Sequence, residues 1–284
     1  NIGKVDNKGY ELSVNWRDRI HDFRYHIGFN LAYAKNKIVF QDEVPYPYDY
    51  MRKTGKPVGQ QMGYKYDGFF SEEDVAKYET ERGKSIPDHG TGYIPKPGDV
   101  KYKDLNNDHK IDQYDVAAIG YPVYPLLTGG INLGFSYKGF DFSMTWSGAT
   151  KVSRLLDDIF REPFGATDSR SLMKYMIDDM WTPEKGNSAK APAISFTNKV
   201  NNYRDSDLWL RDASYLRLKN VEIGYNFPKK ILSKINIGSL RVFATGYNLL
   251  TLDKLKIVDP ESRPNGNAMY PVVMVINMGL KVGF

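Results

Sequence analysis

The sequence predicts an all-β protein whose antiparallel strands have the character of a transmembrane β-barrel. Three observations predict this fold class. Residues 272–284 (VVMVINMGLKVGF) alternate between an apolar face and a smaller, more polar face, and the same alternation recurs along the chain. No run of 18 or more apolar residues appears, so the sequence predicts no transmembrane helix.

The alternation predicts eight strands. Large aliphatic and aromatic residues occupy every second position of each strand, with small or polar residues between them, as barrel strands do when one face meets lipid and the other the lumen. One predicted strand changes phase, which indicates a β-bulge near Lys219 or Asn220. The predicted strands are residues 9–17, 23–35, 57–67, 129–138, 140–149, 207–227, 239–249 and 271–284.

A soluble β-sandwich is the alternative, because its strands also alternate. A sheet that faces water is expected to carry many Lys and Glu residues on its polar face. In the predicted strands that face is richer in Gly, Ser and Asn, for example in residues 131–138. The composition of the strands therefore favours the membrane barrel.

The connections between the predicted strands are unequal in length. Residues 138–139 and 18–22 form short turns, whereas three other connections are long. A membrane barrel has short turns at its periplasmic rim and long loops outside the cell. We therefore expect the long connections to be extracellular loops, and they are residues 36–56, 68–128 and 150–206.

Two of these loops contain short predicted helices. Residues 71–82 begin with Ser71, which can cap the helix, and with acidic residues that suit its positive N-terminal end. A second helical stretch covers residues 169–181 and ends at a Thr-Pro pair. Both helices are expected to pack within their loops.

Composition excludes several other classes of protein. The chain has 284 residues, 21 Tyr, 14% aromatic residues, no Cys and a net charge of +5. The basic residues are dispersed, so we expect no nucleic-acid partner.

Residue 1 leads almost directly into a strand without a signal peptide, and we expect residues 1–284 to be the C-terminal portion of a longer polypeptide.

The sharpest local motif is residues 104–115 (DLNNDHKIDQYD), whose spacing matches a calcium-binding EF-hand loop. Two positions depart from the pattern: His109 replaces the usual Gly, and the last ligand is an Asp in place of a Glu. An Asx-rich turn without metal is the alternative, and both interpretations stay open. The candidate Ca²⁺ ligands are Asp104, Asn106, Asp108, Lys110 (through its backbone carbonyl), Asp112 and Asp115.

The sequence carries no catalytic motif that we recognise. It has no G-x-S-x-G, no P-loop and no G-x-G-x-x-G, and its four His residues lack zinc-ligand spacing. We therefore predict that the protein is not an enzyme.

Four stretches carry a resemblance to a known family. Residues 97–125 contain the acidic loop followed by IGYP, and residues 137–148 read YKGFDFSMTWSG. Residues 212–232 begin DASYLRLKN, and residues 241–261 end in VDPE. In these motifs the chain resembles the C-terminal part of SusC/RagA-type TonB-dependent outer-membrane transporters, with His109 in place of the family's Gly.

The resemblance implies a plugged barrel of roughly 22 strands, of which this chain supplies the last part. It implies import of a glycan or an oligopeptide, energised through TonB, and a SusD-like surface lipoprotein as partner. It places the chain in the lipid of the cell outer membrane as a multi-pass protein. The strand that ends with Leu280, Val282 and Phe284 would then be the signal for membrane insertion.

Two other functions are weighed against import. The first is a non-transporting outer-membrane barrel that anchors surface lipoproteins. The second is a soluble, calcium-dependent, glycan-binding β-sandwich, which would be stable without detergent.

Overall fold

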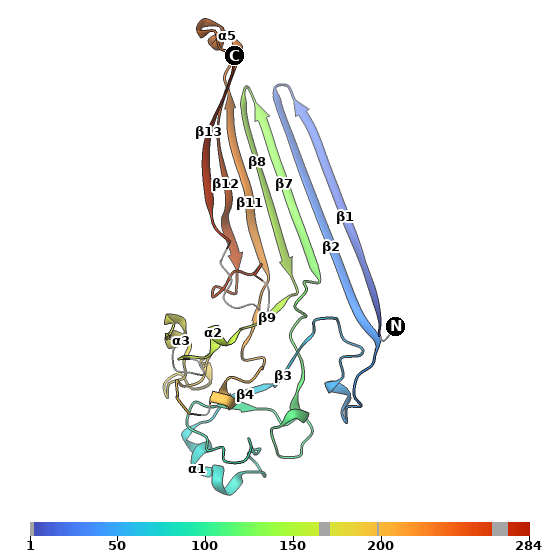
Figure 1. Ribbon diagram of the computed structural model, residues 1–284, viewed down its shortest axis with the longest axis vertical. Coiled ribbons are helices and arrows are strands. Elements are labelled where there is room, and N and C mark those ends of the chain that lie inside the picture. The colour runs from blue at the N-terminus through green and yellow to red at the C-terminus, as the bar shows by residue number, and fades with distance from the viewer. Residues whose placement is uncertain (1–2, 165–170, 198, 263–271) are drawn as a thin grey trace.

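The computed structural model describes residues 3–164, 171–197, 199–262 and 272–284. It consists of a long antiparallel sheet and an assembly of loops at one end of that sheet (Figure 1). Among the described residues, no helix is both long enough and apolar enough to cross a membrane.

The sheet has seven strands in the order β1-β2-β7-β8-β11-β12-β13. Every neighbouring pair is antiparallel, and the strands follow one another across the sheet in the order of the sequence. The all-β antiparallel prediction is therefore confirmed. The strands are β1 (Gly3–Ile20), β2 (Phe23–Gln41), β7 (Leu127–Tyr137), β8 (Phe140–Thr150), β11 (Tyr215–Asn226), β12 (Ser239–Asp253) and β13 (Val275–Gly283).

The connections at the two ends of the sheet differ in length, as predicted. At the end away from the loop assembly, which we call the turn end, β7 and β8 are joined by Lys138 and Gly139 alone. Both have positive φ angles, 46° and 90°, as a two-residue hairpin turn requires. The β11–β12 connection at this end carries α5 (Lys229–Leu232) and η4 (Ser233–Ile235). At the other end the connections span residues 42–126, 151–214 and 254–274.

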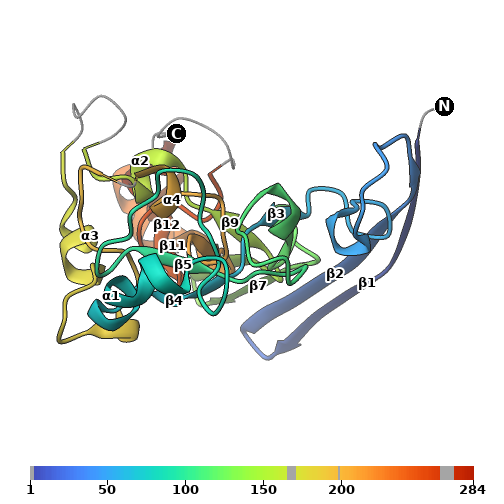
Figure 2. The same ribbon diagram turned by 90° about the horizontal axis from the view of Figure 1, so that it is seen from below.

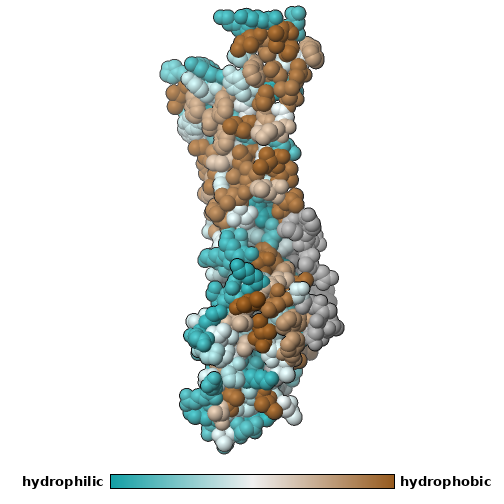
Figure 3. All heavy atoms as spheres, turned by 90° about the vertical axis from the view of Figure 1, so that its left-hand side faces the viewer, coloured by the Kyte–Doolittle hydropathy of each residue, from teal (hydrophilic) through white to brown (hydrophobic). Residues whose placement is uncertain are grey.

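The register keeps like residues on the same face of the sheet. Tyr10 pairs with Tyr33, and Val14 pairs with Phe29, so both pairs lie on one face, the apolar face. Ser13 pairs with Asn30 on the opposite, polar face. Figure 3 shows apolar residues gathered over the strand-bearing half of the molecule, with polar residues over most of the loop assembly.

The predicted bulge is confirmed. The register of β11 against both β8 and β12 shifts between Leu218 and Asn220. The extra residue, Lys219, allows the apolar side chains before and after it to share one face despite their change of phase in the sequence.

The buried core lies in the loop assembly and not in the sheet. Every described residue of β1 is exposed, whereas Phe69, Tyr102 and Trp209 are at most 3% exposed. Phe69 and Tyr102 come from the β2–β7 connection and Trp209 from the β8–β11 connection, so the core joins segments that are distant in the sequence. The core residues are Phe69, Val100, Tyr102, Ile111, Val152, Leu156, Ala189, Tyr203, Leu208, Trp209, Ala213 and Leu255.

Short elements support this core. Figure 1 shows them beyond one end of the strands, and Figure 2 shows most of them grouped together when the molecule is seen from below. Three two-stranded sheets pair β3 with β6, β4 with β5 and β9 with β10. The short elements are η1 (Asp49–Met51), β3 (Gln61–Gly63), β4 (Tyr66–Phe69), α1 (Glu72–Glu81), β5 (Val100–Tyr102), η2 (Gln113–Asp115), β6 (Ala117–Ile119), β9 (Ser153–Leu155), α2 (Asp158–Arg161), α3 (Lys174–Asp179), η3 (Gly186–Ser188), α4 (Lys199–Asn202) and β10 (Leu210–Asp212).

The predicted strand at residues 57–67 is wrong as a strand of the main sheet. This segment contributes only β3 and the start of β4, and both pair inside the loop assembly. A Cβ on Gly63 would lie 2.6 Å from the backbone oxygen of Asp205, so the backbone packs closely against another loop here. Consequently β2 pairs directly with β7, and residues 42–126 form a single connection.

Other boundaries move by smaller amounts. The first part of predicted strand 207–227 leaves the main sheet as β10, which pairs with β9. The last strand begins at Val275 rather than at residue 271, which lies outside the described residues.

The two predicted helices have different outcomes. The helix expected at residues 71–82 is confirmed as α1 and has a capping box between Ser71 and Asp74. The helix expected at residues 169–181 is shorter, Lys174–Asp179, and residues 169–170 lie outside the described residues.

Candidate functional site

The polar face of the sheet is a continuous surface of small and hydrophilic side chains. Across β2, β7 and β8 the register places Gly28, Asn132 and Thr145 in one row. The Thr145 hydroxyl donates a hydrogen bond of 2.9 Å to the Asn132 amide oxygen. In a closed barrel this face would line the lumen, where polar residues contact water or cargo.

Charged residues on the polar face near the turn end form an ion-pair network. The Arg241 guanidinium lies 2.5 Å from the Asp141 carboxylate and 2.6 Å from that of Glu222. The same guanidinium stacks 5.5 Å from the Phe243 ring centroid, a cation–π contact. The network spans β8, β11 and β12, so it stiffens the turn end of the polar face, and its one guanidinium and two carboxylates carry a net charge of −1.

A second network joins the loop end of the polar face to a loop segment. Arg217 on β11 is 2% exposed and binds the carboxylates of Asp259, at 2.7 Å, and Glu261. Lys219 also reaches Glu261, at 2.7 Å, and the Tyr215 hydroxyl donates to Glu261 at 3.0 Å. Because residues 259 and 261 belong to the β12–β13 connection, that loop is held over the polar face.

Sequence reasoning assigned no role to this second network. Arg217 and Lys219 are visible in the sequence as basic residues within a predicted strand, and the acids lie in the DPE segment. No spacing rule links them, because their partners are 42 and 44 residues away. The signal that could have found them is the cost of burying an Arg without a carboxylate partner.

Within the loop assembly, buried polar groups connect separate loops. The Asn201 amide nitrogen donates to the Val100 carbonyl at 2.9 Å, and its amide oxygen lies 3.0 Å from His89 Nδ1. Asn202 bonds the Asp99 carboxylate at 2.6 Å and accepts from the backbone of Val100 at 2.9 Å. The connections between β2 and β7 and between β8 and β11 are therefore locked together.

Burial at this junction changes the ionisation of His89. Its side chain is 3% exposed, and desolvation lowers its pKa from 6.5 to about 4, although its hydrogen bond to the Asn201 amide oxygen opposes the shift. His89 is therefore neutral at neutral pH and acts as a hydrogen-bonding part of the loop core. It does not act as a charge there.

The structure brings the predicted calcium loop into a compact turn. The Asp104 carboxylate accepts backbone N–H bonds from Asn107 and His109, both at 2.7 Å. His109 has a φ of 63°, so it adopts the left-handed geometry expected at the Gly position. Asp115 is fully buried and accepts from the backbone of Leu105 at 2.7 Å.

These bonds occupy the carboxylates with backbone donors. Asp108 accepts from the backbone of Lys110 at 2.9 Å, and Asp112 accepts from that of Tyr114 at 2.8 Å. Across the described residues, no group of three or more His, Cys, Asp or Glu side chains is arranged to hold a metal ion. The loop is thus internally satisfied as an Asx-rich turn, and calcium binding stays a prediction.

The predicted insertion signal lies on the edge strand of the sheet. Val282 and Leu280 on β13 pair with Leu240 and Val242 of β12 and lie on the apolar face. Phe284 follows the strand and is 99% exposed. A role in membrane insertion stays a prediction.

Comparisons with known proteins identify relatives along the whole chain. No protein-family model matches. The chain is 30% identical to TonB-dependent receptor P3 of Formosa agariphila and 26% identical to TonB-dependent receptor SusC of Bacteroides thetaiotaomicron. Both alignments cover 100% of the chain but only 29% and 27% of the relatives, so the chain spans about three tenths of their length.

Solved structures show the same fold. The RagAB peptide transporter superposes with a TM-score of 0.73 at 22% identity, covering 100% of this chain and 29% of the other. The open-open state of the RagAB peptide importer gives a TM-score of 0.72 at 21% identity, covering 99% of this chain and 29% of the other. The two-faced sheet and its loop assembly are thus a known arrangement.

Proposed function

Because the chain is related along its whole length to TonB-dependent transporters of the SusC/RagA type, we propose that it forms part of an outer-membrane barrel that imports a glycan or an oligopeptide. The chain would supply C-terminal strands of a plugged barrel of roughly 22 strands. Other strands of the complete protein would pair with β1 and β13, the two edges of the sheet described here.

The two-faced sheet is the observation that carries this proposal. Its apolar face exposes large side chains such as Val14, Trp16 and Met278, which are 51%, 59% and 86% exposed. Such a surface is costly in water but stable in hydrocarbon. Its polar face is bridged at the loop end by the Arg217 network, and in a closed barrel the bridged loop would cross the path of the cargo.

The partners follow from the same proposal. TonB would supply energy from the inner membrane, and a SusD-like lipoprotein would cover the extracellular loops. The curated relatives are named receptors, which fits a role in transport rather than catalysis. Anchoring of surface lipoproteins without transport is the second candidate. The soluble sandwich has little support, since the described residues contain no second large sheet to cover the apolar face.

Extraction of the complete protein from native outer membranes in mild detergent, followed by mass spectrometry, tests the proposal. We expect a surface lipoprotein and a bound small polymer to co-purify. Cells with and without the gene are then given labelled glycans and labelled oligopeptides. Uptake that needs the gene and stops with a protonophore supports import and identifies the cargo. Retention of the lipoprotein without gene-dependent uptake would instead establish the anchor.

A matched pair of variants tests the part played by the bridged loop. Arg217→Ala removes the buried cation that binds both Asp259 and Glu261, whereas Lys219→Ala removes one half-buried ion pair and leaves Arg217 in place. Loss of a buried ion-pair partner costs about 3–5 kcal/mol, and solvent screening makes the loss smaller for a half-buried pair. We expect Arg217→Ala to change uptake strongly and Lys219→Ala to change it little. Equal uptake by both variants would show that this loop takes no part in transport.

For residues 104–115 we propose that the turn rigidifies its loop and binds Ca²⁺ by reorienting its carboxylates. The oxygen spacing and the left-handed His109 support this proposal. Isothermal titration of the complete protein with CaCl₂, beside an Asp104→Asn variant, tests it. A heat of calcium binding that the parent protein shows and the variant lacks supports a calcium site. Absence of binding in the parent protein leaves the Asx-rich turn as the whole role of the motif.

A further inference from the structure

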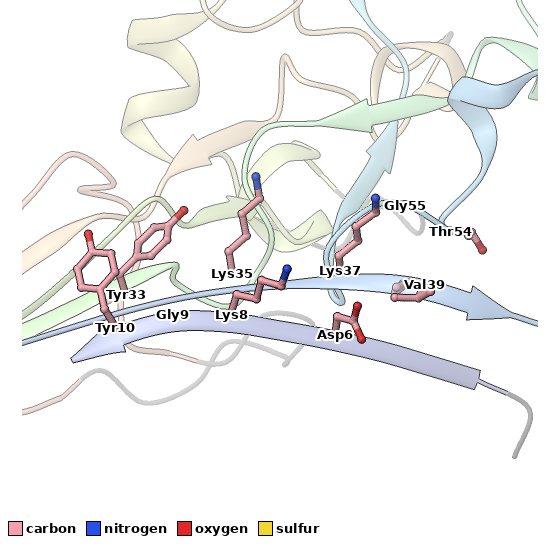
Figure 4. Close-up of a pocket in the computed structure, with 11 residues that line it drawn as sticks. Asp6, Lys8, Gly9, Tyr10, Tyr33, Lys35, Lys37, Val39, Thr54 and Gly55 are labelled. Carbon is pink, nitrogen blue, oxygen red and sulfur yellow. The ribbon is translucent and has the colours of Figure 1, made fainter.

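A row of lysines extends the apolar face of β1 and β2 beyond its last aromatic pair. Lys8 pairs with Lys35, and Asp6 pairs with Lys37, without a register shift between these pairs and Tyr10–Tyr33. Side chains two residues apart on a strand lie on the same face. The lysines therefore project from the face that carries the apolar side chains, and Figure 4 shows Lys8, Lys35 and Lys37 projecting to the same side as the two tyrosines.

The tyrosine pair marks the edge of the apolar band. Tyr10 and Tyr33 stack with ring centroids 5.3 Å apart. Tyr25 lies on the same face of β2. The eight-residue separation from Tyr25 to Tyr33 corresponds to about 27 Å along a strand. A strand tilted by about 40° rises roughly 21 Å along the membrane normal over that length, so the two tyrosines lie near the two limits of an apolar band ~25 Å tall.

If the apolar band lies in the membrane, the lysines lie at the level of the lipid headgroups. Lys8 and Lys35 are one strand repeat, about 7 Å, beyond the tyrosines, and Lys37 is about 14 Å beyond them. All three are exposed. A further cation, Lys151, has its Nζ 5.4 Å from the Tyr33 ring centroid. The apolar stems of such lysines can rest at the interface while their ammonium groups reach outward.

This basic row has no partner of its own among the described residues. Lys8, Lys35 and Lys37 form no ion pair there, although Asp6 lies nearby. Together with Tyr10, Tyr33 and Asp6 they line a hollow of about 810 Å³. A hollow that joins an apolar surface to unpaired ammonium groups complements a molecule with acyl chains and phosphate.

We propose that this hollow binds the phosphorylated headgroup of an outer-leaflet lipid. The acyl chains would lie against Tyr10, Tyr33 and the apolar face below them, and the phosphate would contact Lys8, Lys35 and Lys37. The proposal rests on the outer-membrane location proposed above, since only that location places the hollow at the outer leaflet.

The test uses the complete protein in nanodiscs made from equal parts of phosphatidylcholine and phosphatidic acid. The variant carries Lys8→Gln, Lys35→Gln and Lys37→Gln. The matched control carries Lys229→Gln, Lys230→Gln and Lys234→Gln, which remove three exposed lysines at the turn end. Native mass spectrometry then counts the phosphatidic acid molecules that each protein retains.

We expect the triple variant to retain phosphatidic acid on the order of 100-fold more weakly, because each of the three lysines near a membrane surface contributes about fivefold. The control should match the parent protein. Equal retention by the variant and the control would overturn the inference. Displacement of the lipid from the parent by an equal concentration of inorganic phosphate would also overturn it, since the site would then bind a soluble anion.

Cell fractionation separates this inference from the proposed function. If the parent protein fractionates with the outer membrane but the triple variant retains lipid normally, only the lipid site fails. If the parent protein is recovered in the soluble fraction, the barrel proposal fails, and the lipid site fails with it.

Discussion

The sheet and the loop assembly differ in where their apolar side chains lie. In the sheet, strands pair with their neighbours in sequence, and large apolar side chains such as Trp16 and Met278 remain exposed. In the loop assembly, apolar residues from distant segments are buried, and Asn201 and Asn202 tie those segments together. The difference agrees with the proposal that lipid surrounds the sheet, whereas the loop assembly has a core of the kind found in water-soluble domains.

The largest expected effect comes from removing a core side chain of the loop assembly. Trp209→Ala should cost about 3–5 kcal/mol, because it leaves a cavity and the Asn202 carbonyl loses a hydrogen bond of 3.0 Å. Hydrogen exchange measured by mass spectrometry should rise in the loops and stay unchanged in the strands. Val44→Ala, at a position 66% exposed, is the control. A matching rise in the strands would show that the two regions are one cooperative unit.

A charge on the apolar face should have the next largest effect. Leu133→Lys places an ammonium group toward the middle of the apolar band and should cost about 2–4 kcal/mol in lipid. Ser143→Lys, one strand away on the polar face, should have little effect, because Glu222 lies beside it in the register. Denaturant midpoints of the complete protein in lipid vesicles measure both. Similar midpoints for the two variants would contradict the assignment of the faces.

Acid should weaken the loop assembly before the sheet. His89 has a folded-state pKa of about 4 against 6.5 when unfolded, so the unfolded chain binds more protons between these values. Stability is therefore lost as pH falls below 6.5, by about 2 kcal/mol between pH 7 and pH 5. Proteolysis of the loops at pH 5 and pH 7 measures the change. In His89→Gln the pH dependence should flatten, and an unaltered slope would assign it to other groups.

The smallest effect is expected at the cap of α1. Ser71→Ala removes the hydroxyl that accepts from the Asp74 backbone at 3.1 Å and should cost about 1 kcal/mol. Local hydrogen exchange within residues 72–81 reports the fraying. Ser71→Asp should restore protection, and failure of that rescue would mean that the cap contributes nothing.

The two regions also differ in how far the sequence predicted them. Alternation predicted the long strands well, because each strand repeats the same two-residue pattern and pairs with the next. The same pattern gave a wrong prediction at residues 57–67. A short alternating segment has the same sequence pattern whether it joins the main sheet or pairs inside a loop. The Arg217 network and the Asn201 junction depend on contacts between distant segments, for which the sequence carries no periodic signal.

The candidate calcium loop falls between these cases. Its turn geometry was predictable from local Asx chemistry, including the left-handed His109. The direction in which each carboxylate points was not, because backbone donors compete with a metal for the same oxygens. Spacing alone therefore predicts the turn better than it predicts the ligand.

The strictly sequential order of the strands has a consequence for the evolution of this architecture. Each connection leaves the sheet and returns to the adjacent position, so its length does not alter which strands are neighbours. Lengthening or replacing residues 42–126 or 151–214 would change the outer surface without disturbing the pairing beneath it. A lineage can thus acquire new recognition surfaces while it retains the inherited sheet.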